Sequence, residues 1–284
     1  MATHARHRPD AGLVASVAKY TLLGLLSVVF LAPFYVIVRN SLMTEDQVTS
    51  LDWSWWPDPL TLGNYTDLFT DPSLPFAHAL RNSLLIAVIT APLSTMTGSM
   101  AGYALARLDV PFRRAVTVFV VGTLMIPASV TFVPTFLVID ALGGVDTQWG
   151  IIAPGLFNAF SVVLFRSFYL RFPPDLEEAG RIDGLGHLGV YLRIVLPNSI
   201  TMIASLGALS FIESWNAFLW PLVVGQDPSS WTAQIALSTF LTSQTINLPG
   251  LFAGGVVTIV PLALMFLVAQ RFIVQGITAS GLKD

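Results

Sequence analysis

The sequence of 284 residues contains no cysteine, and only 11% of its residues are charged. Without cysteine the chain can form neither a disulfide framework nor a thiolate metal site. An ordinary soluble domain is about 25% charged, so the scarcity of charge argues against a water-soluble globule. The formal net charge of −3 is too small to indicate a nucleic-acid partner. The chain is 54% hydrophobic, and this composition is that of a membrane protein.

Lysine is also scarce, and this excludes one way of using ATP. A phosphate-binding P-loop needs a lysine followed by serine or threonine, whereas Lys19 precedes Tyr20 and Lys283 precedes Asp284. The 4 histidines form no His-Glu-x-x-His pattern, and no acid cluster has metal-ligand spacing within the apolar blocks. We therefore expect no catalytic residues, no metal site and no cofactor in this chain.

The apolar residues gather in six blocks, each long enough to cross a bilayer, which takes about 20 mainly apolar residues. Lipid offers no hydrogen-bond partners to an open backbone, so the blocks must be helices. We predict an all-α membrane protein with a tail over residues 1–19 and a transmembrane domain over residues 20–284. The predicted spans, each containing proline, are Tyr20–Val38, Leu84–Leu105, Ala115–Val138, Trp149–Phe168, Ser199–Val224 and Leu251–Phe272.

The distribution of basic residues predicts that both termini are cytoplasmic. Lysine and arginine in connecting segments are retained on the cytoplasmic side. With the N-terminus inside, only Arg39 and Arg81 of the 14 basic residues lie outside. The first block lacks a following Ala-x-Ala-like site, so we expect a retained helix rather than a cleaved signal peptide. Residues 273–284 form the predicted C-terminal tail.

Residues 39–83 form the predicted outer loop. It holds six acids and three tryptophans, Trp53, Trp55 and Trp56. Tryptophans are enriched where a protein meets the lipid headgroups, so the loop can be an interfacial cap. A docking surface for an extracellular partner fits the same residues equally well.

The cytoplasmic segment over residues 166–198 predicts a short helix between the fourth and fifth spans. Asp175 and Glu178 have the spacing of a capping box, and Gly184 suits the left-handed position that follows a helix. We therefore predict a helix over Leu176–Asp183.

The middle of this predicted helix has almost no side chain at Ala179 and Gly180, so another protein could approach its backbone closely. Charged residues surround this strip, namely Glu177, Glu178, Arg181 and Asp183. A solvated helix that only caps the bundle would explain the same pattern.

This segment resembles the EAA loop of the permeases of ABC importers. The matching residues are Glu178-Ala179-Gly180, then Gly184 after three further residues, then Ile194-Val-Leu-Pro197 after nine more. The family usually has Glu-Ala-Ala, so Gly180 departs from it. Glycine keeps the strip small but lowers helix propensity by about 1 kcal/mol relative to alanine.

The resemblance covers nearly the whole chain from the first span onward. The chain is similar in particular to the carbohydrate permeases of the second maltose permease type. The motifs are Leu60-Thr-Leu-Gly-Asn-Tyr65, Arg81-Asn-Ser83, Gly102-Tyr-Ala-Leu-Ala-Arg107, Arg181-Ile-Asp-Gly184, Ser214-Trp-Asn216, Phe218-Leu-Trp-Pro221, Gln270-Arg-Phe272 and Gly276-Ile-Thr-Ala-Ser-Gly281. The family usually carries an acid after Trp-Asn, where this chain has Ala217.

The resemblance implies a permease subunit of the bacterial cytoplasmic membrane that passes a sugar or sugar-like solute inward. Its partners would be a second permease, two cytoplasmic ATPase subunits that bind ATP and magnesium, and an external solute-binding protein or lipoprotein. The region Leu60 to Phe69 would contribute to the surface for that protein. The predicted docking residues for an ATPase subunit are Leu176, Glu177, Glu178, Ala179, Gly180, Arg181, Asp183 and Gly184.

An acid interrupts the fifth span and predicts a polar face inside the membrane. Glu213 there costs on the order of 2.5 to 3.5 kcal/mol, so it must face protein or water. Asn216 and Trp220 follow at i+3 and i+7, while Phe211 and Trp215 form a neighbouring aromatic face. Sugars offer hydroxyls to carboxylates and amides and apolar faces to rings, so these five residues are predicted to line a translocation path.

Three alternatives stay open at this point. Glu213 could be hydrogen-bonded between helices, with the aromatic residues filling the bundle. The partner permease could hold most of the solute contacts, leaving this chain to act mainly as a gate. A proton-coupled secondary transporter could use Glu213 as its carrier, although such proteins usually show internal repeats and none is evident here.

Overall fold

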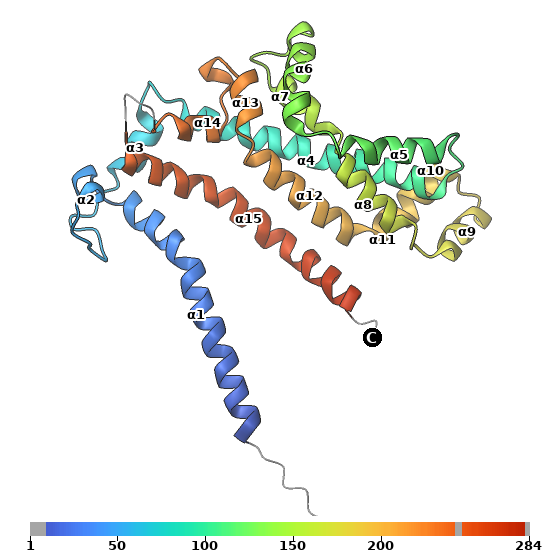
Figure 1. Cartoon of the computed structure of the whole chain (residues 1–284), viewed down its shortest axis with the longest axis horizontal. Helices are drawn as coiled ribbons and strands as arrows, with labels where there is room; N and C mark the ends of the chain where they lie inside the picture. Colours follow the sequence, from blue (N-terminus) through green and yellow to red (C-terminus); the bar gives the residue numbers. More distant parts are fainter. Residues whose placement is uncertain (1–9, 242–245, 282–284) are drawn as a thin grey trace, which may run out of the picture. The chain divides into compact units, whose positions relative to one another are not determined.

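The computed structural model describes residues 10–241 and 246–281, and these residues are almost entirely helical (Figure 1). The β contact among them is an isolated bridge between Leu241 and Ile246. The chain divides into two compact units. The first comprises residues up to Thr70 together with Phe240–Val257, and the second comprises Asp71–Thr239 together with the residues from Thr258 onward.

Four helical stretches are long and apolar enough to cross a membrane, namely Ala15–Ser41, Phe76–Arg107, Gln148–Tyr169 and Leu248–Phe272. Two further pairs reach that length only together: Arg113–Thr123 with Ala128–Ala141, bent by 100°, and His187–Asn198 with Ile200–Trp215, bent by 79°. The prediction of an all-α membrane protein is confirmed. By length and composition, the described residues contain four candidate spans, or up to six if each bent pair counts as one.

The first unit contains α1 (Asp10–Ser41), α2 (Glu45–Thr49), α3 (Gly63–Thr70) and the beginning of α15 (Leu248–Gly281). The helix α1 begins well before Tyr20, inside the stretch predicted as a tail, and α15 likewise continues through most of the predicted C-terminal tail. Residues 1–9 and 282–284 of those tails lie outside the described residues. The end of α1 is held by Asn64, whose amide donates to the carbonyls of Ser41 and Met43 at 2.8 Å each.

The second unit is built around α4 (Phe76–Arg107), which lies alongside α8 (Ala159–Tyr169) and α12 (Ile200–Trp215) (Figure 1). Gly98 and Gly102 of α4 form a Gly-x-x-x-Gly pair facing α8. A Cβ atom at Gly102 would lie 2.6 Å from the Cβ of Phe165, and one at Gly98 would lie 2.9 Å from that of Ser161. Small residues at this spacing let two helix backbones approach closely.

The predicted third span, Ala115–Val138, is broken in the structure. The helix α5 (Arg113–Thr123) ends there, and α6 (Ala128–Ala141) begins directly after Pro127. A proline ring clashes with the carbonyl four residues earlier, which here belongs to Thr123, the last residue of α5. The sequence predicted one span across this proline, whereas the chain turns by 100°.

The predicted fifth span, Ser199–Val224, is also wrong as a single helix. The helix α12 ends at Trp215, and a separate α13 (Leu219–Val224) follows. Pro221 cannot donate a hydrogen bond to Ala217 and would clash with its carbonyl. In the first turn of a new helix the missing N–H is not needed, so the chain restarts after Phe218.

Short elements connect these helices. They are α7 (Gln148–Ile152), the 3-10 helix η1 (Ala153–Leu156), α9 (Pro174–Ile182), α10 (His187–Val190), the π-helix η2 (Tyr191–Val195), α11 (Leu196–Asn198), the 3-10 helix η3 (Pro228–Ser230) and α14 (Ala233–Ser238). A buried core joins α4, α8, η2 and α12, with Tyr103, Phe165, Tyr169, Val195 and Leu206 among its members.

Candidate functional site

The short helix predicted between the fourth and fifth spans exists as α9, Pro174–Ile182. It begins two residues before Leu176, with Pro174 at its first position and no side-chain cap. Proline at that position is preorganised for a helix, and its missing N–H would be unpaired there anyway. The predicted capping box is therefore wrong, because Asp175 already lies inside the helix.

The other end of α9 closes as predicted at Gly184. This glycine has a φ of +84°, and its N–H donates to the carbonyl of Arg181 at 3.0 Å, while that of Leu185 donates to Gly180 at 3.0 Å. These two bonds and the left-handed residue make a Schellman motif, which pairs carbonyls that the helix end would leave free. The direction of the chain after α9 is thereby fixed.

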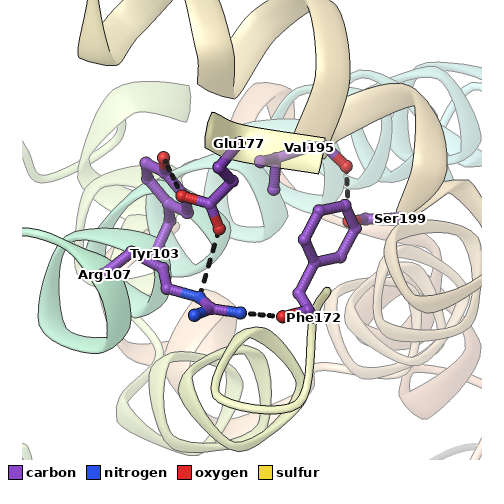
Figure 2. A network of polar contacts seen from close by, with 6 residues as sticks. All are labelled: Tyr103, Arg107, Phe172, Glu177, Val195 and Ser199. Atoms are coloured by element: carbon purple, nitrogen blue, oxygen red, sulfur yellow. Dashed lines mark hydrogen bonds and ion pairs between the residues drawn. The ribbon is translucent and has the colours of Figure 1, made fainter. Parts of the chain in front are cut away.

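Glu177 attaches the first turn of α9 to the end of α4, as Figure 2 shows. Its side chain is buried, with Oε1 3.2 Å from Nε of Arg107, and its Oε2 accepts a hydrogen bond of 3.1 Å from the hydroxyl of Tyr103. Arg107 also donates from Nη2 to the carbonyl of Phe172, just before α9. One arginine therefore holds both the turn that leads into α9 and the first turn of the helix.

A set of hydroxyl groups extends this attachment to neighbouring elements. Ser99 of α4 lies 2.6 Å from the hydroxyl of Tyr169 in α8 and 2.9 Å from that of Tyr191 in η2. The ring of Tyr103 meets that of Tyr169 edge-on, with centroids 5.7 Å apart. Every one of these groups is buried, so the end of α4, α8 and the segment before α12 form one polar junction.

The strip at Ala179 and Gly180 does not form one outward surface. Gly180 is buried, and a Cβ there would lie 2.3 Å from Cδ1 of Ile194 in the same chain. Ala179 is exposed. The prediction that both leave room for a partner is wrong for Gly180, because its missing side chain makes room for Ile194.

The outward face of α9 is made of other residues. Leu176 and Ile182 are 43% and 86% exposed, and Glu178, Arg181 and Asp183 are exposed as well. A hollow of about 770 Å³ lies beside this face, lined by Arg171, Leu176 and residues of α8 and α12 among others. The face thus combines apolar side chains with both signs of charge, while Glu177 points inward.

Glu213 and Trp220 meet at a second cavity, of about 530 Å³. Thr90 of α4, Asn158 at the start of α8 and Ser210 of α12 also line it. The i+7 spacing of Glu213 and Trp220 predicted that they share a helix face. This spacing does not bring them together, because α12 ends at Trp215. The turn before α13 brings Trp220 to the cavity instead, with its ring edge-on to Phe132 at 5.6 Å.

The other three predicted path residues lie elsewhere. Trp215 is 1% exposed and donates from Nε1 to the carbonyl of Thr258 in α15 at 3.2 Å. Phe211 stacks on it with ring centroids 6.0 Å apart, which confirms the predicted i, i+4 aromatic pair. Asn216 is exposed at the end of α12 and accepts a long hydrogen bond, 3.5 Å, from Gln234. Trp215 therefore packs inside the chain rather than lining the cavity.

Sequence reasoning did not single out Tyr103, Arg107 and Thr90. The first two stand in the Gly102–Arg107 motif, so the sequence offered a signal for their importance without naming the partner. Thr90 carried no signal of its own. Its place at the cavity follows from the packing of α4 on α12.

Residues 94–279 match the family described as binding-protein-dependent transport system inner membrane component. The chain belongs to this family. This permease is similar to the arabinooligosaccharides transport system permease protein AraQ of Halalkalibacterium halodurans, 34% identical over 95% of this chain and 93% of the relative. The AraQ protein of Bacillus subtilis is 31% identical over 98% of this chain and 99% of its own.

A solved structure supports the same fold for the permease. A chain in the crystal structure of a bacterial ABC transporter involved in the import of the acidic polysaccharide alginate aligns with a TM-score of 0.81 at 22% identity, over 95% of this chain and 100% of that one. The family match and the curated relatives, rather than this fold alone, make the permease a multi-pass membrane subunit of an ABC importer. It is not itself an enzyme, and ATP is hydrolysed by partner subunits. The alternative of a proton-coupled secondary transporter is wrong, because the chain belongs to a family of binding-protein-dependent transport systems.

Proposed function

We propose that this permease forms a heterodimer with a second permease and passes a sugar or sugar-like solute from an external binding protein into the cytoplasm. Two cytoplasmic ATPase subunits, which bind ATP and magnesium, would complete the complex. The names of the relatives support an oligosaccharide of arabinose as the first solute to test. The permease would lie in the cytoplasmic membrane of a bacterium with both termini inside, as the basic residues predict.

The observation that carries this proposal is the outward face of α9. Leu176 and Ile182 expose apolar surface on a helix of mixed charge, and Gly184 fixes how the helix ends. Apolar anchors rimmed by charged groups are typical of a protein interface. In this proposal α9 enters a groove of an ATPase subunit, and Ala179 provides the small contact on its exposed side.

The cavity at Glu213 supports a role in the translocation path. The hydroxyl of Thr90 and the indole N–H of Trp220 are buried without hydrogen-bond partners among the described residues. Such groups cost about 1–3 kcal/mol each when left unpaired. A rearrangement that opens the cavity would pair them with water or with the hydroxyls of a solute, next to the carboxylate of Glu213.

The experiment is purification of the complex through a tag on this chain, followed by uptake of arabinooligosaccharides into proteoliposomes. Ile182→Asp should remove the ATPase subunits from the purified complex. Phe112→Asp is the matched control, because Phe112 is 84% exposed and precedes α5 on the same predicted side. Retention of the ATPase subunits by Ile182→Asp would contradict docking through α9.

The predicted surface from Leu60 to Phe69 is tested separately, by crosslinking to the binding protein. Trp53, Trp55 and Trp56 are exposed in the preceding segment, which fits either contact with lipid headgroups or contact with a protein. Crosslinks that require the binding protein's solute would support docking. Crosslinks to lipid alone would support the interfacial cap.

A further inference from the structure

The beginning of α4 holds a loop that lies far along the chain, between α13 and α14. Asn82 is 4% exposed, and its amide donates to the carbonyls of Ser229 at 2.8 Å and Trp231 at 3.0 Å. Its Oδ1 accepts from Nε2 of Gln148 at 2.9 Å. Both amide protons of Asn82 are thus used. Together the three hydrogen bonds fix the orientation of the Asn82 side chain relative to its partners.

Ser83 makes the same connection one residue later. Its hydroxyl accepts from the N–H of Ala233 at 2.8 Å, at the first residue of α14. Thr232 precedes that helix without capping it through its side chain. The capping acceptor for α14 is therefore supplied by α4, so the loop and the helix after it are both fixed to the start of α4.

The loop itself has little freedom to move independently. The carboxylate of Asp227 accepts from the N–H of Ser229 at 2.8 Å and from its hydroxyl at 2.5 Å. Asp146 accepts in turn from the N–H of Asp227 at 2.6 Å. We call residues 227–233 the α4-bound loop, and its position follows that of Asn82.

The opposite end of α4 holds α9 through Tyr103, Arg107 and Glu177, as described above. An α-helix rises 1.5 Å per residue, so Asn82 and Arg107 are separated by about 38 Å along one continuous helix. Between them, Gly98 and Gly102 pack on the backbone of α8, and Ser94 pairs with Ser210 of α12 at 2.6 Å. This packing opposes bending of α4 between its two ends.

We propose that α4 is a rigid connection between the α4-bound loop and α9, and that Asn82 and Glu177 are the positioning residues that fix its two ends. The proposal rests on the proposed function, in which α9 meets an ATPase subunit on one side of the membrane. Movement of α9 then moves the loop on the other side, in addition to any movement passed along the chain through Pro197 to α12.

The chemistry at both ends favours this reading over simple packing. Apolar residues of similar volume commonly stabilise a buried site as well as polar pairs do. Directional bonds to an amide and a carboxylate, in contrast, fix one relative orientation of the elements that they join. Such joints suit elements that must move together.

The test uses the absence of cysteine in this chain, which lets two spin labels be placed at Asp175→Cys on α9 and Gln226→Cys beside the α4-bound loop. Both positions are exposed, and neither is a proposed docking residue. The distance between the labels is measured by electron paramagnetic resonance in the complete complex, first without nucleotide and then with ATP, magnesium and vanadate. The intact connection should keep one distance in both states.

Glu177→Gln and Asn82→Ala should each let that distance change between the two states, and the double variant should change no more than the single ones, because all three interrupt one connection. Thr95→Val is the control, since Thr95 is buried in the middle of α4 and takes part in neither joint, so its distance should stay constant. A distance that already changes in the unsubstituted complex, or stays constant in Glu177→Gln and Asn82→Ala, overturns the proposal.

Failure of the proposed function gives a different result. If no ATPase subunits are purified with the chain, nucleotide cannot act on the labels and the docking proposal fails first. With the ATPase subunits bound, the ATPase stimulation by solute-loaded binding protein should fall about fivefold or more in either positioning variant. Basal ATPase activity of Asn82→Ala should be unchanged, which a general loss of structure would not allow.

Discussion

Glu177 Oε1 lies 3.2 Å from Arg107 Nε, and the two side chains are 5% and 18% exposed. This ion pair joins the second predicted span to the segment between the fourth and fifth. The bond from Arg107 to the carbonyl of Phe172 strengthens the same junction. The position of α9 is consequently set by α4 as well as by its own chain neighbours.

Glu177 and Glu178 offer a matched pair of substitutions, because one is buried and the other exposed. Glu177→Ala leaves Arg107 and Tyr103 without their acceptor. Breaking a fully buried pair costs about 3–5 kcal/mol, and we expect about 1–3 kcal/mol here because Arg107 is partly exposed. The melting temperature of the purified permease should therefore fall in Glu177→Ala and stay unchanged in Glu178→Ala. Equal melting temperatures would contradict the ion pair's role.

Substitutions at Gly184 and Gly186 distinguish the effect of backbone strain from the effect of crowding. A Cβ at either position meets no atom of this chain within 4 Å, but only Gly184 has a positive φ. A β-branched residue in the left-handed region costs about 1–2 kcal/mol or more. Gly184→Val should therefore lower ATPase attachment or uncouple hydrolysis from transport, and Gly186→Val should do neither. Normal transport and ATPase activity in Gly184→Val would refute the need for this turn.

Gly180 leaves room for the end of the Ile194 side chain. Gly180→Ala would gain about 1 kcal/mol of helix propensity, but its Cβ would lie 2.3 Å from the end of the Ile194 side chain. We expect Gly180→Ala alone to lower the melting temperature, and Gly180→Ala with Ile194→Val to restore it. Ile194→Val alone serves as the control for the lost methyl group. A double variant no more stable than Gly180→Ala would show that the clash has another origin.

The sequence predicted α9 closely because local chemistry determines it. Proline starts the helix and glycine in the left-handed region ends it, and neither depends on distant residues. The partners of its side chains do depend on them. Nothing in the local pattern distinguishes Glu177 from Glu178, and only the position of Arg107 at the end of α4 shows which of the two is buried.

The predicted fifth span, in contrast, could not be predicted correctly from local sequence. An apolar block predicts that a segment crosses the membrane, but not whether it does so as one helix. Pro221 was visible in the sequence, yet Pro33, Pro92 and Pro261 lie inside continuous helices. Whether a proline kinks or ends a helix depends on the packing around the carbonyl that it displaces, which local sequence does not contain.

The turn at Asp227 provides a pH-dependent test of the α4-bound loop. The hydroxyl and the N–H of Ser229 hold the pKa of the Asp227 carboxyl below its ordinary value. A lowered pKa favours folding at pH values above the unfolded value of about 3.9, and this contribution is lost as pH falls through the lower folded value. A fluorophore at Gln226→Cys should report a transition only below about pH 4. Ser229→Ala should move that transition upward, whereas an identical midpoint would contradict the assignment.

The two neighbouring residues Trp215 and Asn216 should respond differently to substitution. Trp215 is buried and hydrogen-bonded to Thr258, so Trp215→Ala should destabilise the permease by about 3–5 kcal/mol and lower its yield. Asn216 is exposed at the end of α12, so Asn216→Ala should leave assembly and melting temperature intact while reducing arabinooligosaccharide uptake. Glu213→Gln, at the cavity, should reduce uptake in the same way. If Asn216→Ala and Glu213→Gln both transport normally, the path does not run along this end of α12, and the partner permease holds the solute.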